Sequence, residues 1–352
     1  MLYSPLKVFH HRDRIDALRR GDQPAPAQVQ LIITNRCNSR CKFCAYRMLG
    51  YTSNQLFNAA DQLDYAKVVE ILDDCVDLDV RAVQITGGGE PTIHPQFTEI
   101  VADVLERGLD LALVTNGNAV PEAAIPMLAR AAWVRFSLDA GNEATYRSLR
   151  GVSESVFRRT WKNIDRVVVE KYHQQTDVII GIGFVVTREN FDEVITATED
   201  ARDAGVDNIR LSAVFQNDGA DYFDAIHPEA ITLCREAKKL ETPTFKVFNN
   251  FDHRFEDLEL AHPDYTFCGV QHFNTYVGAD LQVYRCCVQA YNRCGLVGSI
   301  RDQRFAVIWQ SNENRDNFST FDARGCEWCM FNDKNRTIAY ATSTNPPHVN
   351  FV

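Results

Sequence analysis

The chain has 352 residues, of which 45% are hydrophobic, enough for a packed core and for about two domains. Its 37 basic and 47 acidic residues give a formal net charge of -10, which makes nucleic acid an improbable partner because binding would place this charge against phosphates. No stretch is apolar and long enough to span a membrane, and residues 1–14 lack the apolar segment of a secretory signal, so we expect a cytoplasmic protein without a membrane partner. Eleven cysteines in such a chain favour metal or redox chemistry over disulfides.

Residues 1–29 are expected to form a lead-in segment, and a short strand is predicted at 31–33. Three cysteines follow this strand with the spacing C-x3-C-x2-C, namely Cys37, Cys41 and Cys44. Thiolates are soft ligands that suit iron-sulfur clusters or zinc, and three of them are one fewer than the usual four. In a cubane cluster, one iron would then be open to a small chelating molecule. A zinc knuckle, or surface thiols without a metal, are the alternatives.

This cysteine motif, with the aromatic Phe43 just before its last cysteine, resembles the signature of the radical S-adenosylmethionine (SAM) enzymes. The resemblance implies that Cys37, Cys41 and Cys44 hold a 4Fe-4S cluster whose open iron chelates the amino and carboxylate groups of SAM, with Phe43 at the cofactor site. An electron from a donor such as flavodoxin or ferredoxin would split SAM into methionine and a 5'-deoxyadenosyl radical. That radical takes a hydrogen atom from the substrate.

The next part of the chain shows alternating helix and strand patterns. A helix begins near Asp61 and carries Cys75 on its apolar face, where we expect this thiol to be buried. Strands are predicted at 80–86, 111–115, 133–138, 178–186 and 208–214, and helices at 97–107, 123–131, 153–171 and 191–204. With the strand at 31–33, the pattern predicts an α/β fold with six parallel strands, a partial (β/α)6 TIM-like barrel over residues 30–240. Chemistry in such barrels lies at the carboxyl ends of the strands.

The second predicted strand runs into a glycine-rich turn that ends in a carboxylate, Gly87-Gly88-Gly89-Glu90-Pro91. Consecutive glycines let the backbone approach a ligand closely, and a carboxylate can pair with an ammonium group. A plain tight turn is the alternative. The resemblance implies that Gly88, Gly89 and Glu90 hold the amino group of SAM.

Polar residues also end the third and fourth predicted strands. The resemblance assigns Ser137 and Asp139 to the ribose or carboxylate of SAM, with Asn116 close by. Asn116-Gly117 is also a common turn pair, and Ser137 or Asp139 could instead cap the next helix.

Two further features resemble the family less specifically. Gly181 and Gly183, in the fifth strand, match glycine positions near the adenine of SAM, although strand curvature would also explain them. Arg150 is a candidate catalytic residue that would contact a carboxylate or the substrate, and its alternative is a solvated arginine at a helix end.

From about residue 243 the alternation stops and cysteines become frequent. We predict a small cysteine-rich domain at 241–330 with a hairpin formed by 275–277 and 281–285, whereas Cys234 lies on a helix face and is expected to be core. The hairpin would bring Cys268 and Cys286 together, and Cys326 and Cys329 form a C-x2-C pair. Four thiols make a closed metal site.

This arrangement resembles the SPASM extension of radical SAM enzymes, and in particular its shorter twitch form. The resemblance implies a second, auxiliary 4Fe-4S cluster on Cys268, Cys286, Cys326 and Cys329. Cys287 or Cys294 could replace Cys286, and a structural zinc site is the alternative. The tail at 331–352 is expected to help close the barrel mouth.

The sequence therefore predicts a radical SAM enzyme with two clusters, whose substrate is a small polar metabolite that is dehydrogenated or rearranged. About 30 residues precede the first cysteine strand, too few for the peptide-recognition domain of many maturases of ribosomally made peptides. Such a maturase is the first alternative. A non-catalytic iron-sulfur or zinc scaffold is the second, although it would have no use for the glycine-rich turn and the polar strand ends.

Overall fold

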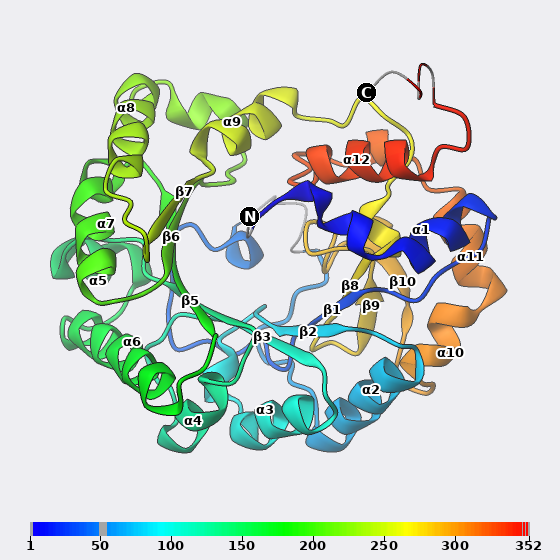
Figure 1. Cartoon of the computed structure of the whole chain (residues 1–352), viewed down its shortest axis with the longest axis horizontal. Helices are drawn as coiled ribbons and strands as arrows, with labels where there is room; N and C mark the ends of the chain where they lie inside the picture. Colours follow the sequence, from blue (N-terminus) through cyan, green and yellow to red (C-terminus); the bar gives the residue numbers. More distant parts are fainter. Residues whose placement is uncertain (1–2, 49–54, 347, 349, 351–352) are drawn as a thin grey trace.

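The computed structural model describes residues 3–48, 55–346, 348 and 350. Its strands form one sheet in the order β10-β9-β8-β1-β2-β3-β4-β5-β6-β7. The sheet curves, and the helices cover its outer side (Figure 1). None of the helices in the described part of the chain has the length and apolar character needed to cross a bilayer.

The partial barrel predicted from the sequence is confirmed. Seven neighbouring strands are parallel: β1 (Gln28–Leu31), β2 (Ala82–Ile85), β3 (Asp110–Thr115), β4 (Trp133–Ser137), β5 (Ile179–Val186), β6 (Asn208–Ala213) and β7 (Lys246–Asn249). Helices on the outer side include α2 (Tyr65–Asp77), α3 (Phe97–Glu106), α4 (Ile125–Leu128), α5 (Glu143–Arg150), α6 (Ser155–Gln174), α7 (Val194–Asp203) and α8 (His227–Lys238). Strand β7 was not among the six predicted strands, because only one of its four residues, Val247, is buried and the segment shows no alternation.

The core lies between the sheet and the outer helices. In β4, Val134 and Phe136 are buried in this core, so the alternate residues Trp133, Arg135 and Ser137 project from the inner face of the sheet. On the helices, the apolar stripes face the sheet, and the thiols of Cys75 in α2 and Cys234 in α8 are fully buried, as predicted.

The predicted hairpin is confirmed as β8 (Asn274–Val277) and β9 (Gln282–Tyr284), with β10 (Leu296–Ser299) antiparallel to β9. Strand β8 pairs with β1 in parallel, Gln28 opposite Asn274 and Leu31 opposite Val277. The cysteine-rich region therefore extends the barrel sheet at one edge, while β7 extends it at the other. Helices α10 (Phe305–Gln310) and α11 (Asn312–Ser319) complete this region, whereas α9 (Phe251–Leu260) contacts β6 and α8 near the other edge (Figure 1).

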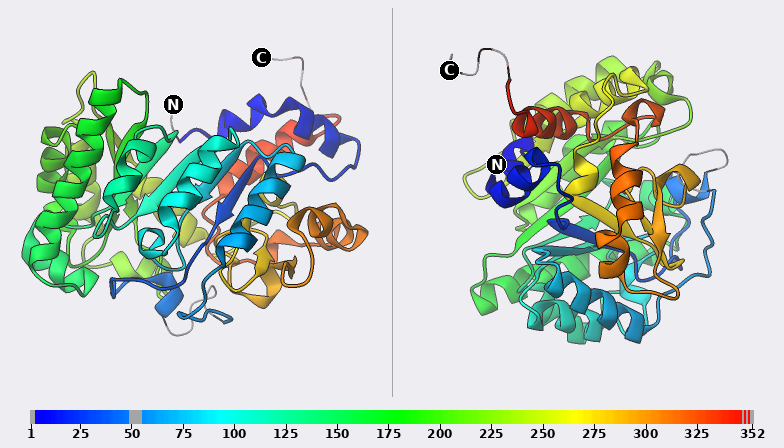
Figure 2. Two further views of the ribbon diagram at one scale, coloured as in Figure 1. Left: turned by 90° about the horizontal axis from the view of Figure 1, so that it is seen from below. Right: turned by 90° about the vertical axis from the view of Figure 1, so that its right-hand side faces the viewer.

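The chain ends pack together at the amino ends of the strands. Helix α12 (Asn332–Thr342) lies beside η1 (Pro5–His10) and α1 (Arg12–Arg19), as both views of Figure 2 show. Ile338 shares one apolar cluster with Ala27 and Phe273, which directly precede β1 and β8. The prediction that the tail helps close the barrel mouth is therefore wrong for α12, because the mouth is at the carboxyl ends. Residues 347, 349 and 351–352 of that tail lie outside the described residues.

Candidate functional site

The first three cysteines lie in the loop between β1 and η2 (Ala45–Arg47), beyond the carboxyl end of β1. This loop is fixed to the end of α5 by hydrogen bonds from the backbone N–H groups of Arg40 and Lys42, of 2.8 and 2.9 Å. Burial raises the pKa of the Cys37 thiol to about 11. The thiols are thus partly buried and carried by a loop with an anchored backbone.

Arg150, at the end of α5, connects this loop to the end of β4. One of its terminal nitrogens donates to the sulfur of Cys41 at 3.2 Å, and the other donates to the carboxylate of Asp139 and to the carbonyl of Ser137. Its guanidinium also lies 5.7 Å from the ring of Phe43. Burial acts to lower the pKa of Arg150, but Asp139 and Cys41 raise it above its usual value. The side chain is 5% exposed, so the alternative of a solvated helix-end arginine is wrong.

Asp139 is also held from β5, since its carboxylate accepts from the backbone N–H of Val185 at 2.6 Å. Its φ of 57° is unusual for a residue other than glycine and marks a constrained backbone at the strand end. The cap of α5 is Asn142, whose side chain accepts from Thr145 at 3.0 Å. The alternative that Ser137 or Asp139 caps this helix is therefore wrong.

The glycine-rich turn packs directly against the start of the cysteine loop. A Cβ on Gly88 would lie 1.9 Å from the side-chain oxygen of Asn35, and one on Gly89 would lie 1.9 Å from the carbonyl oxygen of Arg36. The N–H groups of Gly89 and Glu90 donate to the carbonyls of Thr34 and Arg36 at 3.0 and 2.8 Å. Close contact between two loops thus requires glycine here, whether or not a ligand does.

Glu90 is buried and its carboxylate accepts four hydrogen bonds. The donors are the N–H and hydroxyl of Thr92, the hydroxyl of Thr115 and the N–H of Asn116, at 2.6 to 3.1 Å. Burial raises the pKa of this carboxyl group, although these donors oppose the shift. Glu90 therefore joins the turn after β2 to the end of β3, a contact that the sequence did not indicate.

Asn116 completes the connection to the cysteine loop. Its side-chain amide donates to Asn38 at 2.7 Å and to Ser39 at 3.3 Å. Asn118, which the sequence analysis did not single out, donates to the same Ser39 hydroxyl at 2.8 Å. The N-x-N spacing that follows β3 is the signal by which Asn118 could have been found.

Gly181 and Gly183 occupy inner-face positions of β5. A Cβ on Gly181 would lie 2.7 Å from the side-chain oxygen of Asn208, and one on Gly183 would lie 3.2 Å from Cδ of Arg135. Side chains of the two neighbouring strands therefore fill the space above these glycines.

The second cysteine group is near the amino ends of the strands, whereas the first group is beyond the carboxyl end of β1. Cys268 precedes β8, and Cys286 follows β9, which runs antiparallel to β8. Cys268, Cys286, Cys326 and Cys329 all line one small cavity of about 20 Å³.

Two other cysteines are outside this set. Cys294 is exposed, and its thiol donates to the side-chain oxygen of Gln289 at 2.7 Å. Cys287 is absent from the residues that line the cavity, and the positive charges of Arg254 and Lys334 act on it. The geometry therefore favours Cys286 over Cys287 and Cys294 as the fourth thiol.

Thiolates of a cubane each bind a different iron, whereas those of a zinc site all bind one ion. Within the described residues, no three Cys, His, Asp or Glu side chains are grouped as the ligands of a single metal ion would be. Metal analysis therefore decides between a cluster and zinc at both places.

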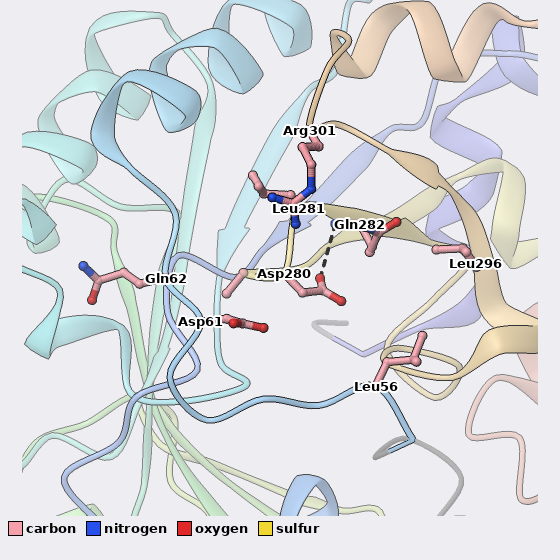
Figure 3. Close-up of a pocket in the computed structure, with 9 residues that line it drawn as sticks. Leu56, Asp61, Gln62, Asp280, Leu281, Gln282, Leu296 and Arg301 are labelled. Carbon is pink, nitrogen blue, oxygen red and sulfur yellow. Dashed lines mark hydrogen bonds between the residues drawn. The ribbon is translucent and has the colours of Figure 1, made fainter.

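A separate pocket of about 510 Å³ lies between the segment 56–62 and the turn of the β8–β9 hairpin. Figure 3 shows Asp61 and Asp280 at its wall, with Arg301 reaching in from the segment after β10. None of the predicted site residues lines it, so the site described above does not include it.

Comparison with known proteins gives a consistent picture. Residues 31–195 match the family model of the radical SAM superfamily. A tungsten-containing aldehyde ferredoxin oxidoreductase cofactor-modifying protein of Pyrococcus furiosus is 30% identical over 230 residues, 63% of this chain and 60% of that protein. A probable GTP 3',8-cyclase of Saccharolobus islandicus is 30% identical over 189 residues, 52% of this chain and 55% of that protein. The chain thus spans less than two thirds of these relatives.

A solved structure shares the fold over nearly the whole chain. Streptococcus suis SuiB, crystallised with the precursor peptide SuiA, superposes with a TM-score of 0.64 at 14% identity, covering 91% of this chain and 73% of SuiB. The match extends beyond residues 31–195, so the cysteine-rich region belongs to the shared fold.

Proposed function

We propose that this chain, whose residues 31–195 match the radical SAM family model, is an enzyme that cleaves SAM reductively and abstracts a hydrogen atom from a small polar metabolite. The observation that carries the proposal is the network around Cys41. Arg150 joins that thiol to Asp139 and Ser137, while Asn116 joins the same loop to Glu90. The cysteine loop is thus connected to the turn after β2 and to the ends of β3 and β4, at the carboxyl ends of the strands.

When bound, the cluster would supply the electron that cleaves SAM. Cys37, Cys41 and Cys44 would hold the cluster, on a loop whose backbone is anchored to α5. We assign Ser137 to the ribose or carboxylate of SAM, and the turn at Gly88 and Gly89 to the neighbourhood of its amino group. Glu90, Asp139 and Arg150 act as positioning residues, because the protein itself engages their side chains.

The auxiliary site is proposed to hold a second 4Fe-4S cluster on Cys268, Cys286, Cys326 and Cys329. The thiols of Cys286, Cys326 and Cys329 are buried, which suits a cluster shielded from water. An electron donor such as flavodoxin or ferredoxin is a further part of the proposal.

A small molecule is favoured as substrate over a peptide. The two sequence relatives are named for modifying a cofactor and for cyclising GTP, whereas the likeness to SuiB, at 14% identity, concerns the fold. We therefore place the peptide maturase second.

Anaerobic reconstitution with iron and sulfide, followed by dithionite and SAM, tests the proposal. We expect about eight irons per chain and release of 5'-deoxyadenosine. Cys41→Ala should lose about half of the iron and all of the nucleoside product, whereas Cys294→Ala, which changes an exposed thiol, should lose neither. Zinc binding with no nucleoside product would instead identify a scaffold.

A further inference from the structure

Two arginines project from the inner face of the sheet on either side of β5. Arg135 is on β4 and Arg210 is on β6, and their chain neighbours Val134, Phe136, Ile209 and Leu211 are buried in the core on the outer side. In the sheet, Arg135 is opposite Gly181, and Arg210 is opposite Gly183. The glycines leave room for both side chains over β5, since a Cβ on Gly183 would touch Arg135.

No carboxylate of the described residues neutralises this pair. Asp139, whose charge acts on Arg210, is already bound by Arg150. Among the described residues, Arg135 donates a hydrogen bond to the uncharged hydroxyl of Tyr3 at 3.1 Å, and Nε of Arg210 is buried without a hydrogen-bond partner. The ring of Tyr3 lies 5.4 and 5.7 Å from the two guanidinium groups, a contact that leaves their charges unneutralised. Burial and the neighbouring charge of Arg135 lower the pKa of Arg210 to about 9. Two like charges held together in this way are unfavourable unless an anion joins them.

Other inner-face side chains also lack partners. The side-chain oxygens of Asn208 on β6, Gln30 on β1 and Asn274 on β8 are buried without a hydrogen bond in the described part of the chain. Buried polar atoms are normally paired, so several orphans on one face indicate a surface that receives a polar ligand or water.

The arginine pair lies on the same face of the sheet as Ser137, nearer the amino ends of the strands. Along β4, Arg135 is two residues before Ser137 and four before Asp139. A molecule on this face would therefore sit within the barrel, next to the residues expected to bind SAM.

We propose that Arg135 and Arg210 form the anion subsite of the substrate, so that the substrate carries a phosphate or carboxylate group. This inference rests on the proposed function and narrows its small polar metabolite to an anionic one. Two guanidinium groups match the oxygens of either anion through paired N–H donors.

Titration calorimetry on the anaerobically reconstituted full chain, with saturating SAM present, tests the subsite. Pyrophosphate and succinate represent the two anion classes, and myo-inositol represents a neutral polyol. We expect one or both anions to bind and inositol not to bind. Arg135→Gln and Arg210→Gln should each weaken anion binding at least about tenfold, since a charge-assisted hydrogen bond contributes about 1.5–3 kcal/mol.

Arg202→Gln is the matched control, because it removes one positive charge from the outer helix α7 and should leave the affinity within about twofold. If a Gln variant fails to fold by circular dichroism, Arg210→Lys replaces it, and this variant should bind with intermediate affinity. Equal affinity in the wild type and the variants, equal binding of inositol, or absence of any anion binding would overturn the subsite.

Competition between SAM and the anions would also overturn the subsite, because the arginines would then bind the carboxylate of SAM and not the substrate. The same samples report 5'-deoxyadenosine formation. A chain that makes no nucleoside refutes the proposed function, while the calorimetry still decides whether the arginines bind anions.

Discussion

At the scale of single residues, the site depends on side chains that hold one another before any cofactor arrives. Arg150 is the clearest case, because one guanidinium binds a thiol of the cysteine loop and both a carboxylate and a carbonyl at the end of β4. The sequence indicated the residues at the strand ends but not these connections, which arise only when α5 returns the chain to the cysteine loop.

Arg150→Lys keeps the positive charge but loses the fork that reaches Cys41 and Asp139 together. We expect 5'-deoxyadenosine formation to fall at least about tenfold, because the cluster loop and the end of β4 are no longer fixed to each other. Product formation and the KM for SAM would be measured on the reconstituted chain. Arg147→Lys, an exposed arginine on the same helix, should leave both values unchanged. Normal activity of Arg150→Lys would contradict a positioning role.

Glu90→Gln replaces a carboxylate that accepts four hydrogen bonds with an amide. The NH2 group of this amide would face groups that now donate to the carboxylate, so some of these hydrogen bonds would be lost. A buried mismatch of this kind costs about 1–3 kcal/mol, which should lower the thermal midpoint by a few degrees. Anaerobic thermal melts monitored by circular dichroism would detect the change. The matched control is Glu99→Gln, an acidic residue on the first turn of α3. An unchanged midpoint for Glu90→Gln would show that this network contributes little.

At the scale of elements, strands and helices with a clear apolar pattern were predictable, and the packing of distant elements against one another was not. The alternation through β6 follows from local periodicity, although the first strand, predicted at 31–33, is observed at Gln28–Leu31. Strand β7 and the placement of α12 do not follow from it, because only Val247 of β7 is buried and α12 is located by contacts with η1 at the other end of the chain. Asp74 is another residue whose position the sequence does not reveal, since an acid on α2 would be expected to face water.

Asp74 is instead fully buried and caps a distant helix. Its carboxylate accepts from the N–H of Ala306 at 3.2 Å, at the start of α10, and pairs with Arg304 at 2.6 Å. Asp74→Ala should destabilise the protein by about 2 kcal/mol through loss of this cap. Asp77→Ala, on the same helix and 67% exposed, should change stability by less than about 0.5 kcal/mol. Equal thermal midpoints for the two variants would contradict the capping role.

At the scale of the whole molecule, one strand pairing determines where the two cysteine groups stand. Because β8 is parallel to β1 and in register with it, Cys37 lies beyond the carboxyl end of the pair and Cys268 before its amino end. The paired segment of four residues alone separates these ends by about 10 Å. The sequence could predict each cysteine group but not this separation, since a hairpin gives no sign of the barrel strand with which it will pair.

Because the two cysteine groups are separated, we predict that one site can lose its iron while the other keeps it. Cys329 is on the C-x2-C segment next to α12, and no side-chain contact joins it to the cysteine loop after β1 in the described residues. Cys329→Ala should therefore reduce the iron content from about eight to about four per chain. Reductive cleavage of SAM should persist, because the first three thiols keep their places, whereas turnover of the true substrate should fail. Iron analysis, 5'-deoxyadenosine assays and electron paramagnetic resonance of the reduced protein would measure this. Loss of SAM cleavage together with the auxiliary iron would show instead that the shared sheet couples the two ends, so that β8 transmits the state of one site to β1 and thereby to the other.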